Sequence, residues 1–255
     1  MFKPRFKQHL AGGLAGALLC IGVSSANAAV TTALYLAMDG SGSINSGQFT
    51  QQVNGYVAAL NNVFGVFGGQ LYGNVAIGAS VFGLNFSEYF PVTTINNPTD
   101  LGALTTAIAG LDPGRDGINT SATAIGDAVT AAAGSLIAFE TALGADINLL
   151  IDVTTDGANN IGALPNPASV AALGSGLDAV NCLGIGGGAD CSWVTSPTVV
   201  GTDFGSVGFG ELAGALEDKL VTEIPEIPVP GVAALVGIGL LGLGLTRRAA
   251  GASAG

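Results

Sequence analysis

Residues 31–43, which read TTALYLAMDGSGS, decide the fold. Residues 31–38 form a continuous apolar run, rich in residues that favour β-structure, and this run ends at Asp39. A run of this length is typical of a strand that is buried on both faces in the middle of a sheet. The glycine-punctuated segment 39–43 then predicts a loop at the carboxyl end of that strand.

Apolar runs of this kind alternate along the chain with segments of helical periodicity. Residues 47–64 predict a helix with Ser46 as its N-cap. Two β-rich runs, 74–83 and 87–95, are joined by a very short link and should pair as an antiparallel hairpin. Strands that alternate with helices predict an α/β fold with three layers. We expect a doubly wound, mostly parallel sheet with one antiparallel edge hairpin. Further helices are expected over 99–110, 122–143, 167–177 and 208–223, and further strands over 147–153 and 179–185.

The two ends of the chain have the composition of targeting segments. Residues 1–28 combine a positively charged start, a short apolar run and the small-residue pattern Ala26-Asn27-Ala28, and so predict a secretory signal peptide. A membrane-anchoring first helix is the alternative, but the apolar run is short for a span. The mature chain should therefore begin near Ala29, outside the cytoplasm, with one domain over residues 29–224.

At the other end, a proline-rich linker over 225–231 precedes a hydrophobic segment over 232–255, in which Arg247 and Arg248 close the apolar run. This order predicts a sorting or anchor segment that lies transiently or permanently in a membrane, with its C-terminus in the cytoplasm. It resembles the PEP-CTERM sorting signals that an exosortase handles in biofilm-forming Gram-negative bacteria. The family's Pro-Glu-Pro signature is replaced here by Val229-Pro230-Gly231, so a plain C-terminal anchor is the alternative.

The charge of residues 29–224 excludes nucleic acid as a partner. This region contains seventeen acidic residues and only two basic ones, Arg115 and Lys219, which gives a formal net charge of −15. Affinity for nucleic acid comes from Lys and Arg that neutralise phosphates, and this region lacks them. An acidic surface instead concentrates cations around it.

Histidine and cysteine usage excludes most catalytic machinery. The single histidine, His9, belongs to the predicted signal peptide, so the mature chain can form neither a Ser-His-Asp arrangement nor a His-ligated zinc site. Its two remaining cysteines, Cys182 and Cys191, are expected to form a disulfide in an oxidising compartment. The opposing interpretation places Cys182 inside strand 179–185, too far from Cys191 to bond.

Three polar clusters follow strands or open helices where ligands bind in a sheet of this kind. They are Asp39 with Ser41 and Ser43, then Thr123, and then Asp156 directly after strand 147–153. Each has a simpler explanation by itself, either as turn residues or as a helix start for which Ser121 competes. Together they supply hydroxyl and carboxylate oxygens, the hard ligands that Mg²⁺ or Mn²⁺ prefers. Two carboxylates roughly neutralise a dication and leave a position open for a partner's carboxylate.

The motifs Asp-x-Ser-x-Ser, a threonine followed by glycine, and Thr-Asp-Gly, in this order, resemble the metal-ion-dependent adhesion site of von Willebrand factor A (vWA) domains. The resemblance covers about residues 31–224 and implies that Asp39, Ser41, Ser43, Thr123 and Asp156 hold the metal. Residues 151–160 and 181–185 are also similar to the DUF1194-like bacterial subgroup, which has no established activity. We expect Asp152 and Asn159 to be structural and Asn160 to brace the loop.

These features favour an exported adhesion-type module, not an enzyme, at the cell surface or in the extracellular matrix of a Gram-negative-type bacterium. It would recognise a protein or an acidic glycan through its metal. An alternative is a structural matrix or biofilm protein whose metal site only stabilises the fold. A phosphotransferase with an aspartyl-phosphate intermediate is disfavoured. Ser41 stands where such enzymes have a second aspartate, and the one lysine, Lys219, comes late on a helix.

Overall fold

The computed structural model describes residues 29–111, 115 and 117–224. The predicted signal peptide (1–28), the proline-rich linker (225–231) and the hydrophobic sorting segment (232–255) lie outside these residues. Within the part that is described, no helix is both long and apolar enough to cross a membrane.

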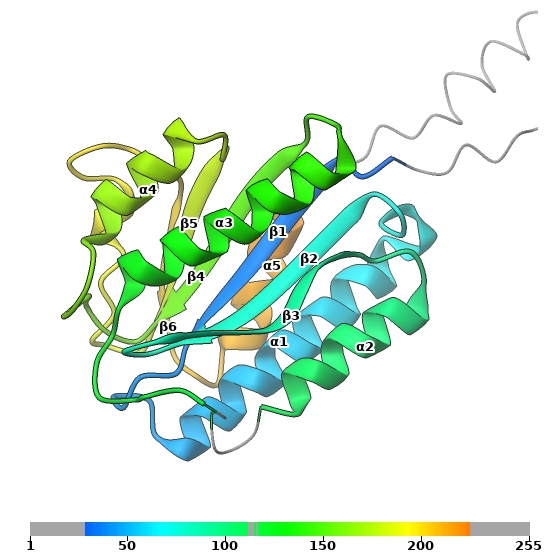
Figure 1. Ribbon diagram of the computed structural model, residues 1–255. Coiled ribbons are helices and arrows are strands. Elements are labelled where there is room, and N and C mark those ends of the chain that lie inside the picture. Colours follow the sequence, from blue (N-terminus) through cyan, green and yellow to red (C-terminus); the bar gives the residue numbers. More distant parts are fainter. Residues whose placement is uncertain (1–28, 112–114, 116, 225–255) are drawn as a thin grey trace, which may run out of the picture.

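A six-stranded sheet forms the centre of the molecule, with the strand order β3-β2-β1-β4-β5-β6 (Figure 1). All neighbouring strands are parallel except β2 and β3, which form the antiparallel edge hairpin. The predicted fold class is therefore confirmed. The strands are β1 (Thr32–Asp39), β2 (Val75–Phe82), β3 (Phe86–Thr94), β4 (Asn148–Thr155), β5 (Ala179–Ile185) and β6 (Asp203–Val207).

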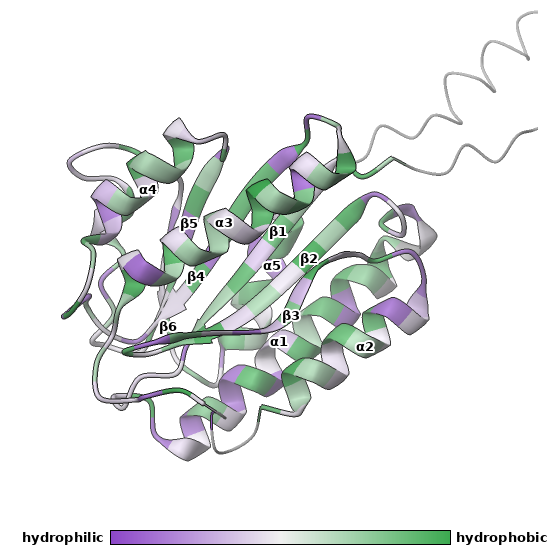
Figure 2. Cartoon of the chain, in the orientation of Figure 1, coloured by the Kyte–Doolittle hydropathy of each residue, from purple (hydrophilic) through white to green (hydrophobic). Residues whose placement is uncertain are grey.

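Helices cover both faces of the sheet, as three layers require (Figure 1). One layer contains α1 (Ser46–Val66), α2 (Pro98–Ala109) and α5 (Leu212–Glu223), and the other contains α3 (Ile125–Leu143) and α4 (Pro165–Gly174). Two short 3₁₀ turns, Gly68–Gln70 and Ser192–Val194, complete the described elements. Figure 2 shows strongly hydrophilic residues on α1 and α2, while β1 and β2 are mostly neutral or hydrophobic.

The central strand β1 is buried on both faces, which explains its unbroken apolar sequence. Leu34, Leu36 and Met38 pack into the core beneath α1, α2 and α5. The alternating residues, among them Tyr35 and Ala37, pack into the core beneath α3 and α4. A strand that is buried on both faces has no exposed position for a charged side chain before its end. Asp39, the last residue of β1, therefore marks the point where the chain reaches the edge of the sheet.

Two helix starts differ from the sequence prediction because a better hydrogen-bonding partner lies nearby. The N-cap of α1 is Asn45, not Ser46. The Asn45 side chain accepts from the Gln48 amide at 3.0 Å, and the Gln48 side chain accepts from the Asn45 amide at 2.9 Å. This reciprocal capping box satisfies two amides, which a serine one residue later does not achieve here. Helix α3 begins at Ile125 instead of 122, because the backbone of Thr123 bonds to Asn160.

The prediction of a helix over 208–223 was wrong at its start, and the strand β6 before it was missed. The helix α5 begins at Leu212, and residues 203–207 pair with β5 at the edge of the sheet. This strand is short, it is mostly solvent-exposed, and Gly205 interrupts it with a φ of 77°. Edge strands of this kind carry little apolar periodicity, so no local signal identifies them. The helix predicted over 167–177 lies at Pro165–Gly174, with the proline pair at its favoured N-terminal position.

A disulfide joins Cys182, in β5, to Cys191, in the loop that follows it, with the two Cα atoms 5.6 Å apart. Both side chains are buried. The bridge ties the end of the glycine-rich loop 186–190 back to the middle of β5, the strand from which the loop leaves.

The parallel strands all end on the same side of the sheet. We call this side the carboxyl edge, and its described residues are 39–45, 83–85, 115, 117–124, 155–164 and 186–191. Helix α5 runs back from the end of β6, so Ile224 lies at the opposite edge, together with Val30 before β1 (Figure 1). The described chain therefore enters and leaves on the side away from the carboxyl edge.

A buried ionic cluster fastens α5 to the sheet. The Lys219 amine lies 2.9 Å from a carboxylate oxygen of Asp152, bonds also to Glu223, and sits 4.6 Å above the Phe204 ring. Asn181 donates to Glu223 at 2.8 Å. Burial raises the pKa of Asp152, and it raises the pKa of Glu223 to about 7. Burial alone would lower the pKa of Lys219, but the two carboxylates raise it, so the cation is retained.

Replacing Lys219 with methionine should destabilise the domain by about 3–5 kcal/mol at pH 8, because two carboxylates are left buried without a cation. Their pKa values are already raised in the folded state and would rise further. The variant therefore loses stability as the pH rises from the pKa of these carboxyl groups in the unfolded chain to their higher pKa in the folded one. Its loss of stability relative to the parent should be smaller at pH 5 than at pH 8. Urea unfolding of both proteins at the two pH values measures this.

The control is the triple variant Lys219→Met, Asp152→Asn, Glu223→Gln, which removes the stranded charges and should recover part of the lost stability at pH 8. A deficit of the same size at pH 5 and pH 8 would contradict the ionic role of Lys219.

Candidate metal-binding site

The Asp39 carboxylate shapes the loop that follows β1. It is fully buried, and its Oδ1 atom accepts from the Ser41 amide at 2.7 Å. Its Oδ2 atom accepts from the Thr155 hydroxyl, at the end of β4, at 2.6 Å. Burial raises the pKa of Asp39, while the bonds from Thr155 and Ser41 oppose that rise. Both oxygens are therefore used to join the first loop to the neighbouring strand end.

Three side-chain oxygens beside Asp39 form a continuous chain. The hydroxyls of Ser41 and Ser43 lie 3.0 Å apart, and the Ser43 hydroxyl donates to Asp156 Oδ1 at 2.6 Å. In an octahedral Mg²⁺ site with ligands at 2.0–2.1 Å, neighbouring oxygens are about 3 Å apart. Ser41 is buried, whereas Ser43 is exposed and Asp156 half-buried, so the cluster opens to solvent on one side. The spacing and the opening fit a hard divalent cation.

Thr123 is positioned through its backbone and is almost fully buried. Its amide donates to the Asn160 side chain at 2.9 Å, and its carbonyl accepts from the Asn160 amide at 3.0 Å, so the predicted role of Asn160 as a brace is confirmed. Asn159 accepts from the Gly126 amide at 3.3 Å, at the start of α3. The described hydrogen bonds connect the other four candidate residues to one another, but they do not reach the Thr123 hydroxyl.

Glycine in the first loop permits a close approach to the segment before α3. The Gly42 amide donates to the Thr120 carbonyl at 2.7 Å, and a Cβ atom on Gly42 would lie only 2.9 Å from that oxygen. A Cβ atom on Gly40 would lie 2.4 Å from a methyl carbon of Val81. Both glycines are therefore required by the packing of the loop, independently of any metal.

Arg115 holds the candidate loop in place, a contact that sequence reasoning missed. Its guanidinium donates to the carbonyl oxygens of Gly40 at 3.1 Å and Ser41 at 3.0 Å, and also to that of Ile44. The same group lies 4.9 Å from the centre of the Phe49 ring and is only 7% exposed. One side chain thus holds three carbonyls of the candidate loop from a segment about 75 residues away.

The guanidinium is also a fixed positive charge beside the candidate carboxylates. Burial lowers the pKa of Arg115, while the charges of Asp39 and Asp156 raise it. Arginine tolerates this burial because its fork of donors satisfies several carbonyls at once. The only available sequence signal was that Arg115 is one of two bases in a very acidic region.

The donor set determines which chemistry the site can perform. The described residues contain no group of three or more histidine, cysteine, aspartate or glutamate side chains that could hold a metal ion. The candidate oxygens are instead serine and threonine hydroxyls with two carboxylates. Such a set suits Mg²⁺ or Mn²⁺ better than the soft or imidazole-bound metals.

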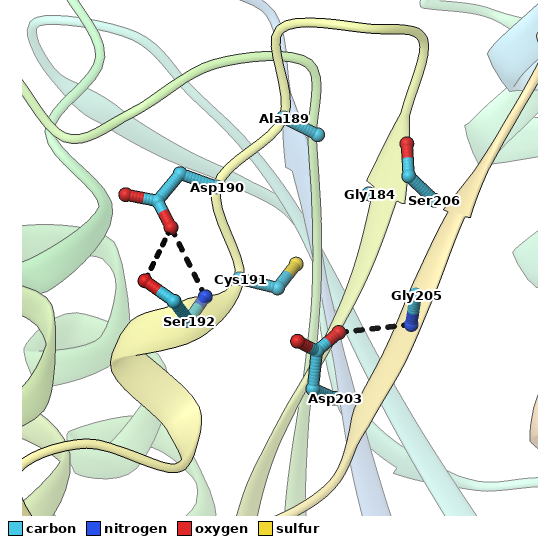
Figure 3. A pocket seen from close by; sticks show the side chains of 8 residues that line it. All are labelled: Gly184, Ala189, Asp190, Cys191, Ser192, Asp203, Gly205 and Ser206. Atoms are coloured by element: carbon cyan, nitrogen blue, oxygen red, sulfur yellow. Dashed lines mark hydrogen bonds between the residues drawn. The ribbon is translucent and has the colours of Figure 1, made fainter.

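A hollow of about 260 Å³ lies away from the candidate site, between β5, β6 and the loop that carries Cys191 (Figure 3). Two aspartates line it, but each is bonded to its own neighbours. Asp190 accepts from the amide and hydroxyl of Ser192, and Asp203 accepts from the Gly205 amide. These carboxylates stabilise turns, so we do not place a functional site there.

Replacing Arg115 with methionine keeps the aliphatic chain over Phe49 but leaves three carbonyls of the loop without their donor. We expect Mg²⁺ affinity to fall by about 10–100-fold, as it does when residues that orient metal ligands are lost. Removal of a positive charge alone would instead strengthen Mg²⁺ binding. Titration calorimetry below the unfolding temperature measures the sign directly.

The matched control is Lys219→Met, which also removes a buried cation but whose described contacts, to Asp152, Glu223 and Phe204, do not include the loop. It should leave Mg²⁺ affinity unchanged. Unchanged or tighter Mg²⁺ binding in Arg115→Met would show that Arg115 does not position the loop.

The fold is shared with proteins of several origins. Proximal thread matrix protein 1 from the mussel byssus is 20% identical, with a TM-score of 0.59 over 78% of this chain and 49% of that one. The von Willebrand factor type A protein from Catenulispora acidiphila is 15% identical, with a TM-score of 0.59 over 76% and 43%. The pilus adhesin SpaC from Lactobacillus rhamnosus is 12% identical, with a TM-score of 0.58 over 76% and 30%.

The chain spans about half the length of the mussel protein. One structure of that protein has a zinc-occupied metal-ion-dependent adhesion site (MIDAS) motif. A comparison with curated proteins finds no match. Residues 29–227 match the family described as a protein of unknown function, DUF1194. The chain therefore belongs to the DUF1194 family, and its fold is that of a von Willebrand factor type A domain.

Proposed function

We propose that this protein is a metal-ion-dependent binding module that captures a carboxylate-bearing partner at its carboxyl edge. Ser41, Ser43 and Thr123 would hold Mg²⁺ or Mn²⁺, with Asp39 and Asp156 close by. The observation that carries the proposal is the chain of oxygens from Ser41 through Ser43 to Asp156, spaced as neighbouring ligands of an octahedral ion.

The charge balance of the site favours binding to a partner. Asp39 already accepts hydrogen bonds on both oxygens, so Asp156 is the carboxylate closest to the open side. Arg115 adds a positive charge beside them. A bound dication would supply an under-neutralised position that attracts the carboxylate of a protein or an acidic glycan. A binding role, not catalysis, also agrees with a mature chain that lacks histidine and has both cysteines in a disulfide.

The direction of the chain suits a role outside the cell. The carboxyl edge lies opposite Val30 and Ile224, which are continuous with the predicted signal peptide and sorting segment. A membrane or matrix attachment through residues 225–255 would therefore leave the carboxyl edge facing away from the attachment point. We propose export to the cell surface or extracellular matrix of a Gram-negative-type bacterium, with a PEP-CTERM-type tail. The adhesin among the similar structures supports this placement.

A second candidate function is that of a structural matrix component in which the metal only stabilises the fold. It is favoured by the many bonds that link the first loop to the segments around Thr120 and Thr155. A metal at their junction would stiffen all three segments whether or not a partner is present. The mussel matrix protein among the similar structures is consistent with this alternative.

Titration of the purified protein with Mg²⁺ should show one site, which Asp39→Ala abolishes and Ser41→Ala weakens strongly. Ser46→Ala is the matched control, because Ser46 is exposed and lies outside the oxygen cluster. Mg²⁺ binding by Asp39→Ala equal to that of the parent would show that the site is misassigned.

The two candidate functions separate in a capture experiment from envelope extracts, run with Mg²⁺ and again with EDTA. A binding module loses its partner with EDTA and in Ser41→Ala. A purely structural metal site lowers the unfolding temperature in EDTA and leaves capture unchanged.

A further inference from the structure

We infer that the partner at the carboxyl edge is a cationic protein segment, with an acidic residue set among basic and aliphatic side chains, and not an acidic glycan. This inference rests on the proposed function and names the partner class for the same site. Two independent observations carry it: the charge of the whole surface and the apolar residues around Thr123.

The described surface carries no positive charge. Arg115 and Lys219 are the only basic residues among those described, and they are 7% and 0% exposed. Both are engaged internally, Arg115 with the carbonyls of the first loop and Lys219 with Asp152 and Glu223. Twelve acidic residues remain at least partly exposed: Glu88, Asp100, Asp127, Glu140, Asp146, Asp156, Asp178, Asp190, Asp203, Glu211, Glu217 and Asp218.

A polyanion is poorly matched to such a surface. The bound dication would attract one carboxylate, but each further carboxylate of an acidic glycan would meet acidic groups such as Asp127, in the first turn of α3. Charges on exposed groups interact over a Debye length of about 8–10 Å, so the carboxylate of the next sugar residue along the glycan would still be repelled by these groups. A segment with lysine or arginine around its acidic residue reverses the sign of these contacts and speeds the encounter.

Three exposed aliphatic residues lie in the segments of the carboxyl edge that adjoin Thr123 and the start of α3. Leu84 is 37% exposed and follows Gly83, whose carbonyl accepts from the Ala124 amide at 2.9 Å. Ile161 is 44% exposed and follows Asn160, which holds both backbone groups of Thr123. Leu164, at the start of α4, is 66% exposed. We call these three residues the rim: they belong to the segments 83–85 and 155–164 of the carboxyl edge, which also carry Asp156.

The composition of this rim favours a protein partner. Exposed aliphatic side chains gain free energy when a partner's apolar groups cover them. The large exposed hydrophobic residues of the described surface are all valine, leucine or isoleucine. Sugar rings are instead recognised by stacking on aromatic side chains, and none of these residues could serve in that way. Both the rim and the surface charge therefore point to a basic, partly aliphatic protein segment.

The test presents the full protein, in saturating Mg²⁺, to a random peptide library and in parallel to immobilised alginate and polygalacturonate. Peptides retained with Mg²⁺ and released by EDTA should be enriched in Asp or Glu with neighbouring Lys or Arg and an aliphatic residue. Their binding should weaken as NaCl is raised and be lost in Ser41→Ala. The two acidic glycans should not be retained.

A pair of matched variants tests the rim. Leu164→Glu should weaken the selected peptides about tenfold. Val66→Glu places the same charge at a residue that is 74% exposed at the end of α1, a helix that begins at the carboxyl edge and runs away from it, and should leave binding unchanged.

Mg²⁺- and Ser41-dependent retention of either glycan would overturn this inference and leave the proposed function standing. Selected peptides without enriched basic residues would also overturn it. If neither peptides nor glycans are retained in a metal-dependent way, both this inference and the proposed binding function fail.

Discussion

The two hydrogen bonds that Asp39 accepts are the contacts on which the carboxyl edge depends. A fully buried carboxylate is costly unless both oxygens are satisfied, and here they are satisfied from two different segments. The bond from the Ser41 amide folds the first loop back on its own strand. The bond from the Thr155 hydroxyl fixes the end of β4 beside it and so places Asp156 within reach of Ser43. The spacing of the oxygen cluster therefore follows from how the sheet satisfies one buried charge.

The described part of the chain has only two basic residues, Arg115 and Lys219, and both are buried inside the fold. Arg115 stabilises the first loop, and Lys219 holds α5 on the sheet by neutralising two buried carboxylates. Lys219 is paired with two buried carboxylates, whereas the buried charge of Arg115 is satisfied by backbone carbonyl oxygens. The consequence is a described surface on which only acidic side chains are charged. Stability of the fold and the sign of the surface potential are thus linked through the same two residues.

The parts of the structure that could be predicted from sequence are those with a local cause. The apolar run before Asp39 predicted a central strand because both faces of β1 are buried, and the short link between the runs 74–83 and 87–95 predicted the antiparallel hairpin. The candidate metal ligands could be predicted to lie together because parallel strands all end at the same edge of a sheet. Strand β6 and the role of Arg115 could not be predicted, since pairing with β5 and bonding to Gly40 are tertiary contacts without a sequence period. The Asn45 cap was missed because two adjacent residues, Asn45 and Ser46, are both good caps and only the reciprocal bond from Gln48 decides.

The oxygens of the cluster are held in place by bonds that a cation would have to replace. The Ser43 hydroxyl donates to Asp156, and the Ser41 hydroxyl pairs with that of Ser43, so part of the free energy of metal binding offsets the loss of these contacts. The loop itself needs little rearrangement, because its backbone is already fixed by two contacts with the segment before α3. The Gly42 amide bonds to Thr120, and Arg115 bonds to the Ser41 carbonyl. Preorganised geometry lowers the cost of binding, whereas the pre-existing hydrogen bonds and the nearby guanidinium raise it. A site balanced in this way should hold its cation only moderately when alone, and a partner's carboxylate, by completing the coordination, would strengthen it.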